Sequence, residues 1–276
     1  MKVREAFEKI ETQFSKAGVD SPAFEVSVLM EDLLGLSKMP EVFAAETMLS
    51  PEQEEIIFAA AKKRESGYPL QYIIGNWEFF GRKFFVGEGV LIPRPETELL
   101  CEFVLKYFSR SVPPTVVDLC SGTGCIAITV AKELPGAKVT AVELYDKAFE
   151  HLERNNELYG NCVSTVKADA LVPFGKFDCI VSNPPYITAK EMKELQREVT
   201  FEPETALFGG EDGLYFYRGI AKNWFDHLND GGVIAFEIGD TQGEAVLSIL
   251  SENGYKNSAV MRDYEGRDRV VTAIKM

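Results

Sequence analysis

The sequence lacks a long hydrophobic run, and it has far fewer basic than acidic side chains. No apolar stretch reaches the length of a membrane-spanning helix, so we expect no contact with a membrane. Residues 1–8 are charged and contain no apolar core, so we expect no secretory signal. Lysine and arginine number 29 against 43 aspartate and glutamate, a formal net charge of −14. Because proteins that bind duplex DNA or RNA usually have a basic surface, we expect no direct nucleic-acid binding.

Cysteine and histidine are also scarce, and their spacing excludes the common metal and disulfide frameworks. The two histidines fall in helical patterns, and we interpret both as structural. The cysteines are odd in number, and no two of them form a Cys-x-x-Cys pair. We therefore expect reduced thiols in a cytoplasmic protein, with no bound metal. The five residues concerned are Cys101, Cys120, Cys125, Cys162 and Cys179.

Residues 1–74 have the pattern of a small helical bundle. Apolar residues between Val3 and Phe14 recur at three- and four-residue intervals, which predicts an amphipathic helix. Ser50 and Gln53 have the spacing of a capping box and predict the start of another helix. Nothing in this segment indicates catalysis. We expect residues 1–74 to form a substrate-recognition domain, with a packing appendage as the alternative.

A change of pattern after residue 74 predicts a second domain of a different class. In residues 75–92 aromatic side chains alternate with glycines, which predicts a β-hairpin that links the domains. Residues 93–276 alternate strand and helix, which predicts a parallel sheet with helices on both faces. Only a turn separates the strands expected at 255–261 and 269–274. The expected fold class is therefore α/β: a mostly parallel, doubly wound sheet with a C-terminal antiparallel hairpin.

A glycine-containing loop follows the first strand of this second domain. Glycines let the backbone approach a ligand, and the helix that begins next attracts anionic groups. Glu143 ends the following strand, where its carboxylate can accept from both hydroxyls of a ribose. The loop fits the cofactor of an NAD-dependent dehydrogenase, and it also fits S-adenosylmethionine. The cofactor-binding candidates here are Asp118, Ser121, Gly122, Gly124 and Glu143.

Three more residues are candidates for the cofactor side of the site. Asp169 ends the third strand, where it could accept from an adenine amino group, although acidic residues at such positions are often only turn caps. Pro95 suits the first position of the helix expected at 99–108. That role does not explain Arg94 between two prolines. We therefore predict that Arg94 and Thr97 lie near the cofactor.

The segment Asn183-Pro184-Pro185-Tyr186 ends the apolar strand at residues 177–182. Neither proline can donate to a sheet, so the strand stops there, at the edge where open α/β sheets bind ligands. The Asn183 side-chain oxygen and a proline carbonyl could accept both hydrogens of a planar amino group. Tyr186 adds an aromatic face. We predict Asn183, Pro184 and Tyr186 as catalytic residues, and all four as substrate-binding residues.

The segment at residues 183–186 favours methyl transfer over hydride transfer. A dehydrogenase normally needs a proton donor or acceptor beside the nicotinamide, and no histidine or lysine is close in sequence to residues 183–186. Methyl transfer from an activated sulfonium depends mainly on positioning the nucleophile in line.

The quoted residues resemble those of class I S-adenosylmethionine methyltransferases that act on planar nitrogens. Over nearly its whole length the sequence is similar to the protein-(glutamine-N5) methyltransferases of peptide chain release factors. One departure is Cys120, where that family usually has glycine, and we expect that a cysteine cannot rely on a positive φ there. The matching stretches are Pro69–Gly75, Ile92–Glu98, Asn183–Tyr186, Phe201–Pro203, Ala206–Phe208 and Gly209–Leu214.

The resemblance implies a substrate, a cofactor and a partner. The substrate would be the glutamine of a Gly-Gly-Gln loop on a release factor, and S-adenosylmethionine would be converted to S-adenosylhomocysteine. Asn183 and the Pro184 carbonyl would hold the glutamine NH₂, with Tyr186 beside the reacting groups. Adenine-N6 methyltransferases of nucleic acids use the same four-residue segment, so a nucleobase is the alternative substrate, although the net charge argues against it. We expect the enzyme to act as a monomer.

Overall fold

The structure is a computed structural model that describes residues 1–109 and 112–276. The chain divides into two compact units. The first contains residues 1–76 together with 196–201, and the second contains residues 77–195 and 202–276. Throughout the described ranges, every helix is too short or too polar to cross a membrane.

The first unit is a bundle of short helices. The predicted helices are confirmed, and in the capping box the Ser50 hydroxyl accepts from the Gln53 amide while the Gln53 side chain accepts from the Ser50 amide. Two helices of four and five residues were not predicted, because such short elements contain too little of a helical period. The elements are α1 (Val3–Ala17), α2 (Pro22–Leu34), α3 (Pro40–Phe43), α4 (Pro51–Glu65) and α5 (Leu70–Ile74).

A buried arginine joins the segment 196–201 to this bundle. Arg64 is only 3% exposed, and its Nη2 donates to Glu25 Oε1 at 2.9 Å. The same nitrogen donates to the carboxylate of Glu198. Because a buried charge needs partners, this pairing explains why six residues from late in the chain belong to the helical unit.

The second unit contains a seven-stranded sheet in the order β5-β4-β3-β6-β7-β9-β8. All strand pairs are parallel except β7 with β9 and β9 with β8, which are antiparallel. The predicted fold class is therefore confirmed. The strands are β3 (Thr115–Leu119), β4 (Lys138–Glu143), β5 (Ser164–Lys167), β6 (Phe177–Ser182), β7 (Leu228–Glu237), β8 (Lys256–Arg262) and β9 (Asp268–Ile274).

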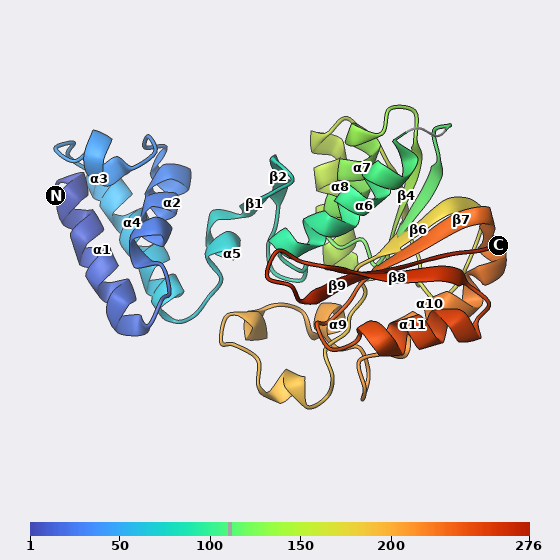
Figure 1. Ribbon diagram of the computed structural model, residues 1–276. Coiled ribbons are helices and arrows are strands. Elements are labelled where there is room, and N and C mark those ends of the chain that lie inside the picture. The colour runs from blue at the N-terminus through green and yellow to red at the C-terminus, as the bar shows by residue number, and fades with distance from the viewer. Residues whose placement is uncertain (110–111) are drawn as a thin grey trace. The chain divides into compact units, whose positions relative to one another are not determined.

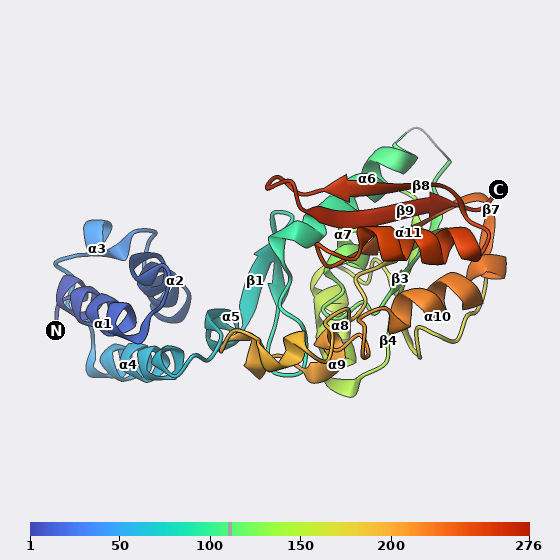
Figure 2. The same cartoon turned by 60° about the horizontal axis from the view of Figure 1, so that its bottom comes forward.

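Helices cover both faces of this sheet (Figures 1 and 2). One hydrophobic core contains buried residues of α6, α7 and α8, and a second core on the opposite face contains those of α10 and α11. A two-stranded hairpin of β1 (Asn76–Phe79) and β2 (Arg82–Phe85) precedes them. The helices are α6 (Glu98–Phe108), α7 (Cys125–Glu133), α8 (Asp146–Leu158), α9 (Glu204–Leu207), α10 (Tyr215–Asn223) and α11 (Gly243–Glu252).

Strand β7 begins earlier than the sequence pattern predicts. The sequence pattern alone predicts a helix over residues 214–228 and a strand over 233–238, but α10 ends at Asn223 and β7 begins at Leu228. The register of β7 on β6 shifts between Phe177 and Cys179, which accommodates the glycine-containing start of β7 as a bulge. Glycines that resemble a turn in sequence are therefore part of a strand.

The strand order reverses beside β3, whose two neighbours are β4 and β6. At such a point the connections leave the sheet in opposite directions and open a crevice at the carboxyl ends of the strands. This edge is where the loops that follow β3, β4 and β6 meet.

Candidate active site

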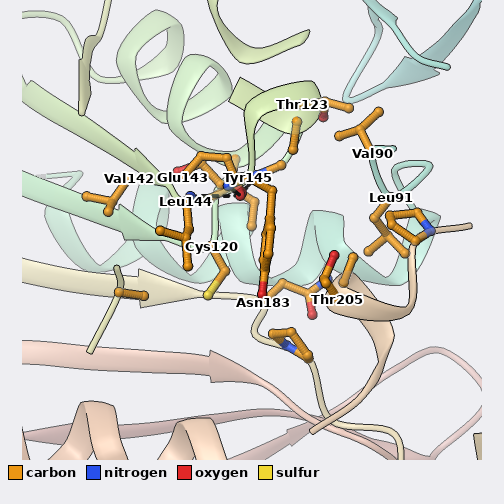
Figure 3. Close-up of a pocket in the computed structure, with 18 of the residues that line it drawn as sticks. Val90, Leu91, Cys120, Thr123, Val142, Glu143, Leu144, Tyr145, Asn183 and Thr205 are labelled. Atoms are coloured by element: carbon orange, nitrogen blue, oxygen red, sulfur yellow. Dashed lines mark hydrogen bonds between the residues drawn. The ribbon is translucent and has the colours of Figure 1, made fainter. Parts of the chain in front are cut away.

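A cavity lies at the carboxyl ends of β3, β4 and β6, with about 890 Å³ of space including its open mouth. Figure 3 shows Cys120, Glu143 and Asn183 at the ends of these strands, with Val90 and Leu91 across the cavity from Val142. Eight predicted site residues line it: Arg94, Thr97, Ser121, Gly122, Glu143, Asp169, Asn183 and Pro185.

Four predicted site residues do not line this cavity in the part of the chain that the structure describes. Asp118 lies in β3 beneath the glycine loop, Gly124 is the buried last residue of that loop, and Pro184 is buried in the loop after β6. Tyr186 packs its ring against the hydrophobic core that contains α10 and α11, and burial raises the pKa of its phenol. These residues are therefore placed to support the walls of the cavity.

The loop after β3 is shaped by three residues with positive φ. Gly122 and Gly124 have φ of 54° and 79°, and a Cβ at Gly124 would lie 2.5 Å from the Cδ1 atom of Leu152. Our expectation for Cys120 was wrong, because its φ is 61° and it adopts the left-handed conformation that glycine favours. The loop therefore keeps the same backbone path at Cys120, at a conformational cost.

The Glu143 carboxylate accepts hydrogen bonds from several backbone amides. Its Oε2 accepts from the Gly122 amide at 2.9 Å, and its Oε1 accepts from the amides of Leu144 and Tyr145 at 2.8 and 2.9 Å. Three of a carboxylate's roughly four acceptor positions are thus occupied. Glu143 holds the glycine loop against the end of β4 and keeps about one acceptor position for a ligand hydroxyl.

Asp118 is a fully buried carboxyl group under the same loop. Its Oδ2 accepts from the Ala127 amide at 3.2 Å, whereas its Oδ1 has no hydrogen-bond partner within the described residues. Burial, with a smaller contribution from the charge of Glu143, raises the pKa of Asp118 to about 8. The Ser121 hydroxyl donates to the Asp118 backbone carbonyl at 2.8 Å, which closes the turn.

Asp169 and its neighbours form the wall of the cavity nearest β5. The Asp169 Oδ1 accepts from the Leu171 amide at 2.8 Å, so the residue does cap a turn. It also lines the cavity beside Val142, Ala168 and Ala170, which makes this wall apolar with one carboxylate at its edge. A flat ring with an exocyclic amino group fits that chemistry.

Asn183 is held in one orientation by a residue distant in sequence. Its Nδ2 donates to the Thr97 Oγ1 at 3.3 Å. Because the side-chain amide is planar, with oxygen and nitrogen on opposite sides, this bond leaves the Asn183 Oδ1 as an acceptor beside the cavity. Behind the loop, the Tyr186 carbonyl accepts from Gln242 Nε2 at 3.0 Å.

The loop after β6 is also clamped by the segment 207–213. Ile187 donates to the Leu207 carbonyl at 2.8 Å, and the Gly209 amide donates to the Ile187 carbonyl at 2.9 Å. A Cβ at Gly209 would lie 2.6 Å from the Tyr186 Cα, and one at Gly213 would lie 2.3 Å from the Tyr186 oxygen. The glycines of this segment are needed because its backbone touches the backbone of the candidate catalytic loop.

Glu202 supports the segment that borders the cavity, and we did not predict this role. It is 6% exposed, and its Oε2 accepts from the Ile92 amide at 3.0 Å while its Oε1 pairs with Arg94. The stretch Phe201–Pro203 was part of the resemblance, but no property of the sequence assigned Glu202 a partner. No cluster of three or more potential ligands for a metal ion is found in residues 1–109 and 112–276.

Comparison with known proteins identifies two domains of this chain. Residues 5–75 match the family model described as the PrmC N-terminal domain. Residues 96–208 match the family model described as the methyltransferase small domain.

Solved structures share the fold at low sequence identity. A methyltransferase from Pyrococcus furiosus is similar with a TM-score of 0.54 and 24% identity, over 82% of this chain and 99% of that one. The hMettl16 catalytic domain, solved in complex with the MAT2A 3′UTR hairpin 6, has a TM-score of 0.57 and 16% identity, over 82% of this chain and 83% of that one. At these identities the likeness shows the fold alone.

Curated relatives are similar over almost the full chain. The release factor glutamine methyltransferase of Clostridium botulinum is 36% identical over 94% of this chain and 94% of its own length. That of Geobacter sulfurreducens is 37% identical over 98% of this chain and 95% of its own length. The chain therefore belongs to the release factor glutamine methyltransferase family.

Proposed function

We propose that this protein transfers a methyl group from S-adenosylmethionine to the side-chain amide nitrogen of a glutamine in peptide chain release factors. The observation that carries the proposal is the full-length similarity to relatives named for that activity, at 36–37% identity. The target within the release factor is the glutamine of its Gly-Gly-Gln loop.

The cavity suits S-adenosylmethionine as the methyl donor. Bound there, this cofactor supplies a methyl group that its sulfonium activates for transfer. Gly122 has no side chain to fill the cavity, and Glu143 keeps an acceptor position for a ribose hydroxyl. Asp169 would accept from the adenine amino group at the apolar wall, and Arg94 and Thr97 also line the cavity.

The loop after β6 binds the substrate amide. The Asn183 Oδ1 and the Pro184 carbonyl accept the two N–H groups of the glutamine, which aims its nitrogen at the cavity. An amide nitrogen is a weak nucleophile because its lone pair is delocalised. Acceptors on both N–H groups favour the positive charge that develops on nitrogen during transfer. The N-protonated amide is strongly acidic, so no dedicated base is required.

Tyr186 belongs to the proposed catalytic segment through its position next to Pro185. Its partly buried ring stabilises the path of the loop, and we propose that an edge of the ring borders the reacting groups. Replacement by phenylalanine keeps the ring and should keep most turnover, whereas alanine should not.

The rival substrate is an adenine amino group in DNA or RNA, which presents the same planar NH₂. A nucleic-acid substrate requires phosphate contacts, and a chain with a net charge of −14 repels phosphate on average. Labelled S-adenosylmethionine, supplied with a release factor or separately with DNA and RNA, tests this choice. Label in the release factor alone is expected; label in nucleic acid alone would overturn the proposal.

The helical unit has an exposed apolar segment that suits recognition of a protein. Met39, Val42 and Phe43 are exposed by 51%, 55% and 73%, although such side chains are usually buried. We propose that residues 1–74 contact the release factor through this segment. Phe43→Ser should raise the KM for a whole release factor and leave the KM for a short Gly-Gly-Gln peptide unchanged. Equal effects on both substrates would leave the unit with a packing role only.

Two further parts of the proposal concern the state of the protein. All five cysteines are free thiols, as expected in the cytoplasm, where we place the reaction. We also propose that the protein works as a monomer. Sedimentation of the active enzyme at the mass of a single 30.8-kDa chain would agree with this, and a dimer would contradict it.

A further inference from the structure

The orientation of the Asn183 amide depends on a buried hydroxyl. Thr97 is 2% exposed and ends the 3₁₀ turn η1 (Pro95–Thr97) before α6. Its Oγ1 accepts the Asn183 Nδ2–H at 3.3 Å. A hydroxyl has one hydrogen to donate, and the bond from Asn183 leaves that hydrogen available for another acceptor.

That acceptor is Glu237, the last residue of β7. Glu237 is 1% exposed, and the nearby Thr97 hydroxyl lowers the pKa of its carboxyl. Its second oxygen, Oε2, has no hydrogen-bond partner within the described residues. A buried carboxyl with an unpartnered oxygen is costly, and no step of the proposed function has used it.

The sheet brings Asn183 and Glu237 to the same place. Ser182, the last residue of β6, pairs with Phe236 of β7 in parallel register, and the next residues along the two chains are Asn183 and Glu237. Asn183 and Glu237 therefore leave the sheet side by side. Thr97 reaches both of them from the segment before α6, so three elements form the row Asn183–Thr97–Glu237.

We propose that Thr97 and Glu237 are positioning residues that determine which end of the Asn183 amide faces the substrate. An ionised carboxylate can only accept hydrogen bonds, so Thr97 must donate to Glu237. Thr97 can then only accept from Asn183, which turns Nδ2 toward Thr97 and leaves Oδ1 for the substrate N–H. The inference deepens the proposed function and rests on it.

The reversed amide would oppose the reaction. If Glu237 is protonated, it can donate to Thr97, whose own hydrogen is then free to bond the Asn183 Oδ1. The Asn183 NH₂ would face the substrate NH₂, and two donors cannot form a hydrogen bond with each other. Turnover therefore depends on the direction of the hydrogen bonds in the row Asn183–Thr97–Glu237, and not only on their presence.

Several charged and titratable groups face Glu237. Burial raises the pKa of Glu237 to about 7, against the opposing effects of Thr97 and the positive charge of Arg269. A carboxyl with that pKa changes charge near neutral pH. The groups around Glu237 come from six parts of the second unit. They are Arg94 and Glu96 before α6, Cys101 in α6, Cys125 in α7, Tyr186 after β6, Tyr217 in α10 and Arg269 in β9.

The first test removes the hydroxyl while keeping its volume. Thr97→Val should lower kcat by about 10- to 100-fold, and affinity for S-adenosylhomocysteine should stay within about threefold. Thr97→Ser restores the hydroxyl and should recover most of kcat. Thr129→Val is the matched control, because Thr129 is fully buried and its hydroxyl has no partner in the described structure. A parallel loss of cofactor affinity in Thr97→Val, or no loss of kcat, would overturn the proposal.

The second test needs no activity. Nuclear magnetic resonance of the free protein measures how fast the Asn183 side-chain amide protons exchange with solvent. One of these protons should exchange slowly in the wild type and in Thr129→Val, and faster in Thr97→Val. Unchanged exchange in Thr97→Val would contradict the proposal. Wild-type protein that fails to methylate any release factor would instead contradict the proposed function, so the two failures are distinguishable.

The third test concerns charge. Because Glu237 becomes protonated as pH falls below about 7, the kcat of the wild type should fall from pH 8 to pH 6. Glu237→Gln has no proton to gain, so its lower kcat should vary less over the same range. An identical pH dependence of kcat in the two proteins would overturn the role of Glu237.

Discussion

Glu202 holds Arg94 in an ion pair at the wall of the cavity, although 108 residues separate them in the chain. The same carboxylate accepts from the amide of Ile92. One side chain thus fixes two points of the segment that leads to Thr97. This ion pair explains why an arginine lies between two prolines. Arg94 anchors the segment and also borders the cavity.

Removing Glu202 should destabilise this segment. Its side chain is 2% exposed, and Arg94 is about one-third exposed. Glu202→Ala should lower the free energy of unfolding by about 3 kcal/mol, because it leaves a backbone amide and a partly buried guanidinium without their acceptor. Glu202→Gln should cost about 1 kcal/mol, since its oxygen can still accept from Ile92.

Urea unfolding measures both changes. Glu204 is two residues away and exposed, so Glu204→Gln is a control that should change stability by less than about 0.5 kcal/mol. If Glu202→Ala were no more destabilising than Glu204→Gln, the pairing with Arg94 and Ile92 would be absent in solution.

The backbone of Cys120 predicts that glycine is more stable than alanine at this position. At φ of 61° a Cβ costs roughly 1–2 kcal/mol relative to glycine. Cys120→Gly removes the Cβ and the sulfur, whereas Cys120→Ala removes only the sulfur. The glycine variant should therefore be more stable than the alanine variant by about 1 kcal/mol in thermal or urea unfolding. Equal stability of the two variants would indicate that the loop adopts a negative φ at this position.

Asp118 predicts a dependence of stability on pH. Its pKa is raised from the ordinary 3.8 to about 8, so the folded state favours the protonated carboxyl. The stabilisation is complete below about pH 4 and is lost as pH rises toward about 8. Asp118→Asn cannot titrate. The stability of the wild type relative to this variant, measured by urea unfolding, should therefore fall between pH 5 and pH 8.

The difference in stability between the wild type and Asp118→Asn removes the contribution of groups that titrate in both proteins. Both proteins are measured without added cofactor. Parallel stability curves for the wild type and Asp118→Asn would show that Asp118 is ionised in the folded protein. A difference that grows in favour of the wild type with rising pH would contradict the burial of this carboxyl as well.

Asn183 should matter for turnover and little for the cofactor. Loss of a positioned contact in the transition state costs on the order of 3 kcal/mol, so Asn183→Ala should lower kcat by roughly a hundredfold. Calorimetry should give nearly unchanged affinity for S-adenosylhomocysteine. Asn223→Ala, at the exposed end of α10, is the control. Near-normal turnover of Asn183→Ala would remove Asn183 from the mechanism.

The elements that sequence patterns predicted best are those with a strong local signal. The capping box at Ser50, the strands β3 and β6 and the terminal hairpin all have periodicity or turn residues that act over a few positions. The start of β7 was missed because Gly231 and Gly232 resemble a turn, and only pairing with β6 makes them a strand.

The candidate site was predictable in its positions and not in its interactions. Strand ends placed Glu143 and Asn183 at one edge of the sheet, which the structure reproduces. The partners of these residues come from other parts of the chain, and a single sequence contains no signal for the contacts of Thr97 with Asn183 or of Glu202 with Arg94. The left-handed Cys120 was missed because a local propensity was overridden by the loop around it.

The central claim is that the methylated atom is the side-chain nitrogen of a glutamine. The direct measurement is tandem mass spectrometry of a release factor treated with the enzyme and S-adenosylmethionine, with untreated protein as the control. The account predicts a single added methyl group on the glutamine side chain of Gly-Gly-Gln, absent with Asn183→Ala. A methyl group on any other residue, or an unmodified release factor alongside methylated nucleic acid, would contradict it.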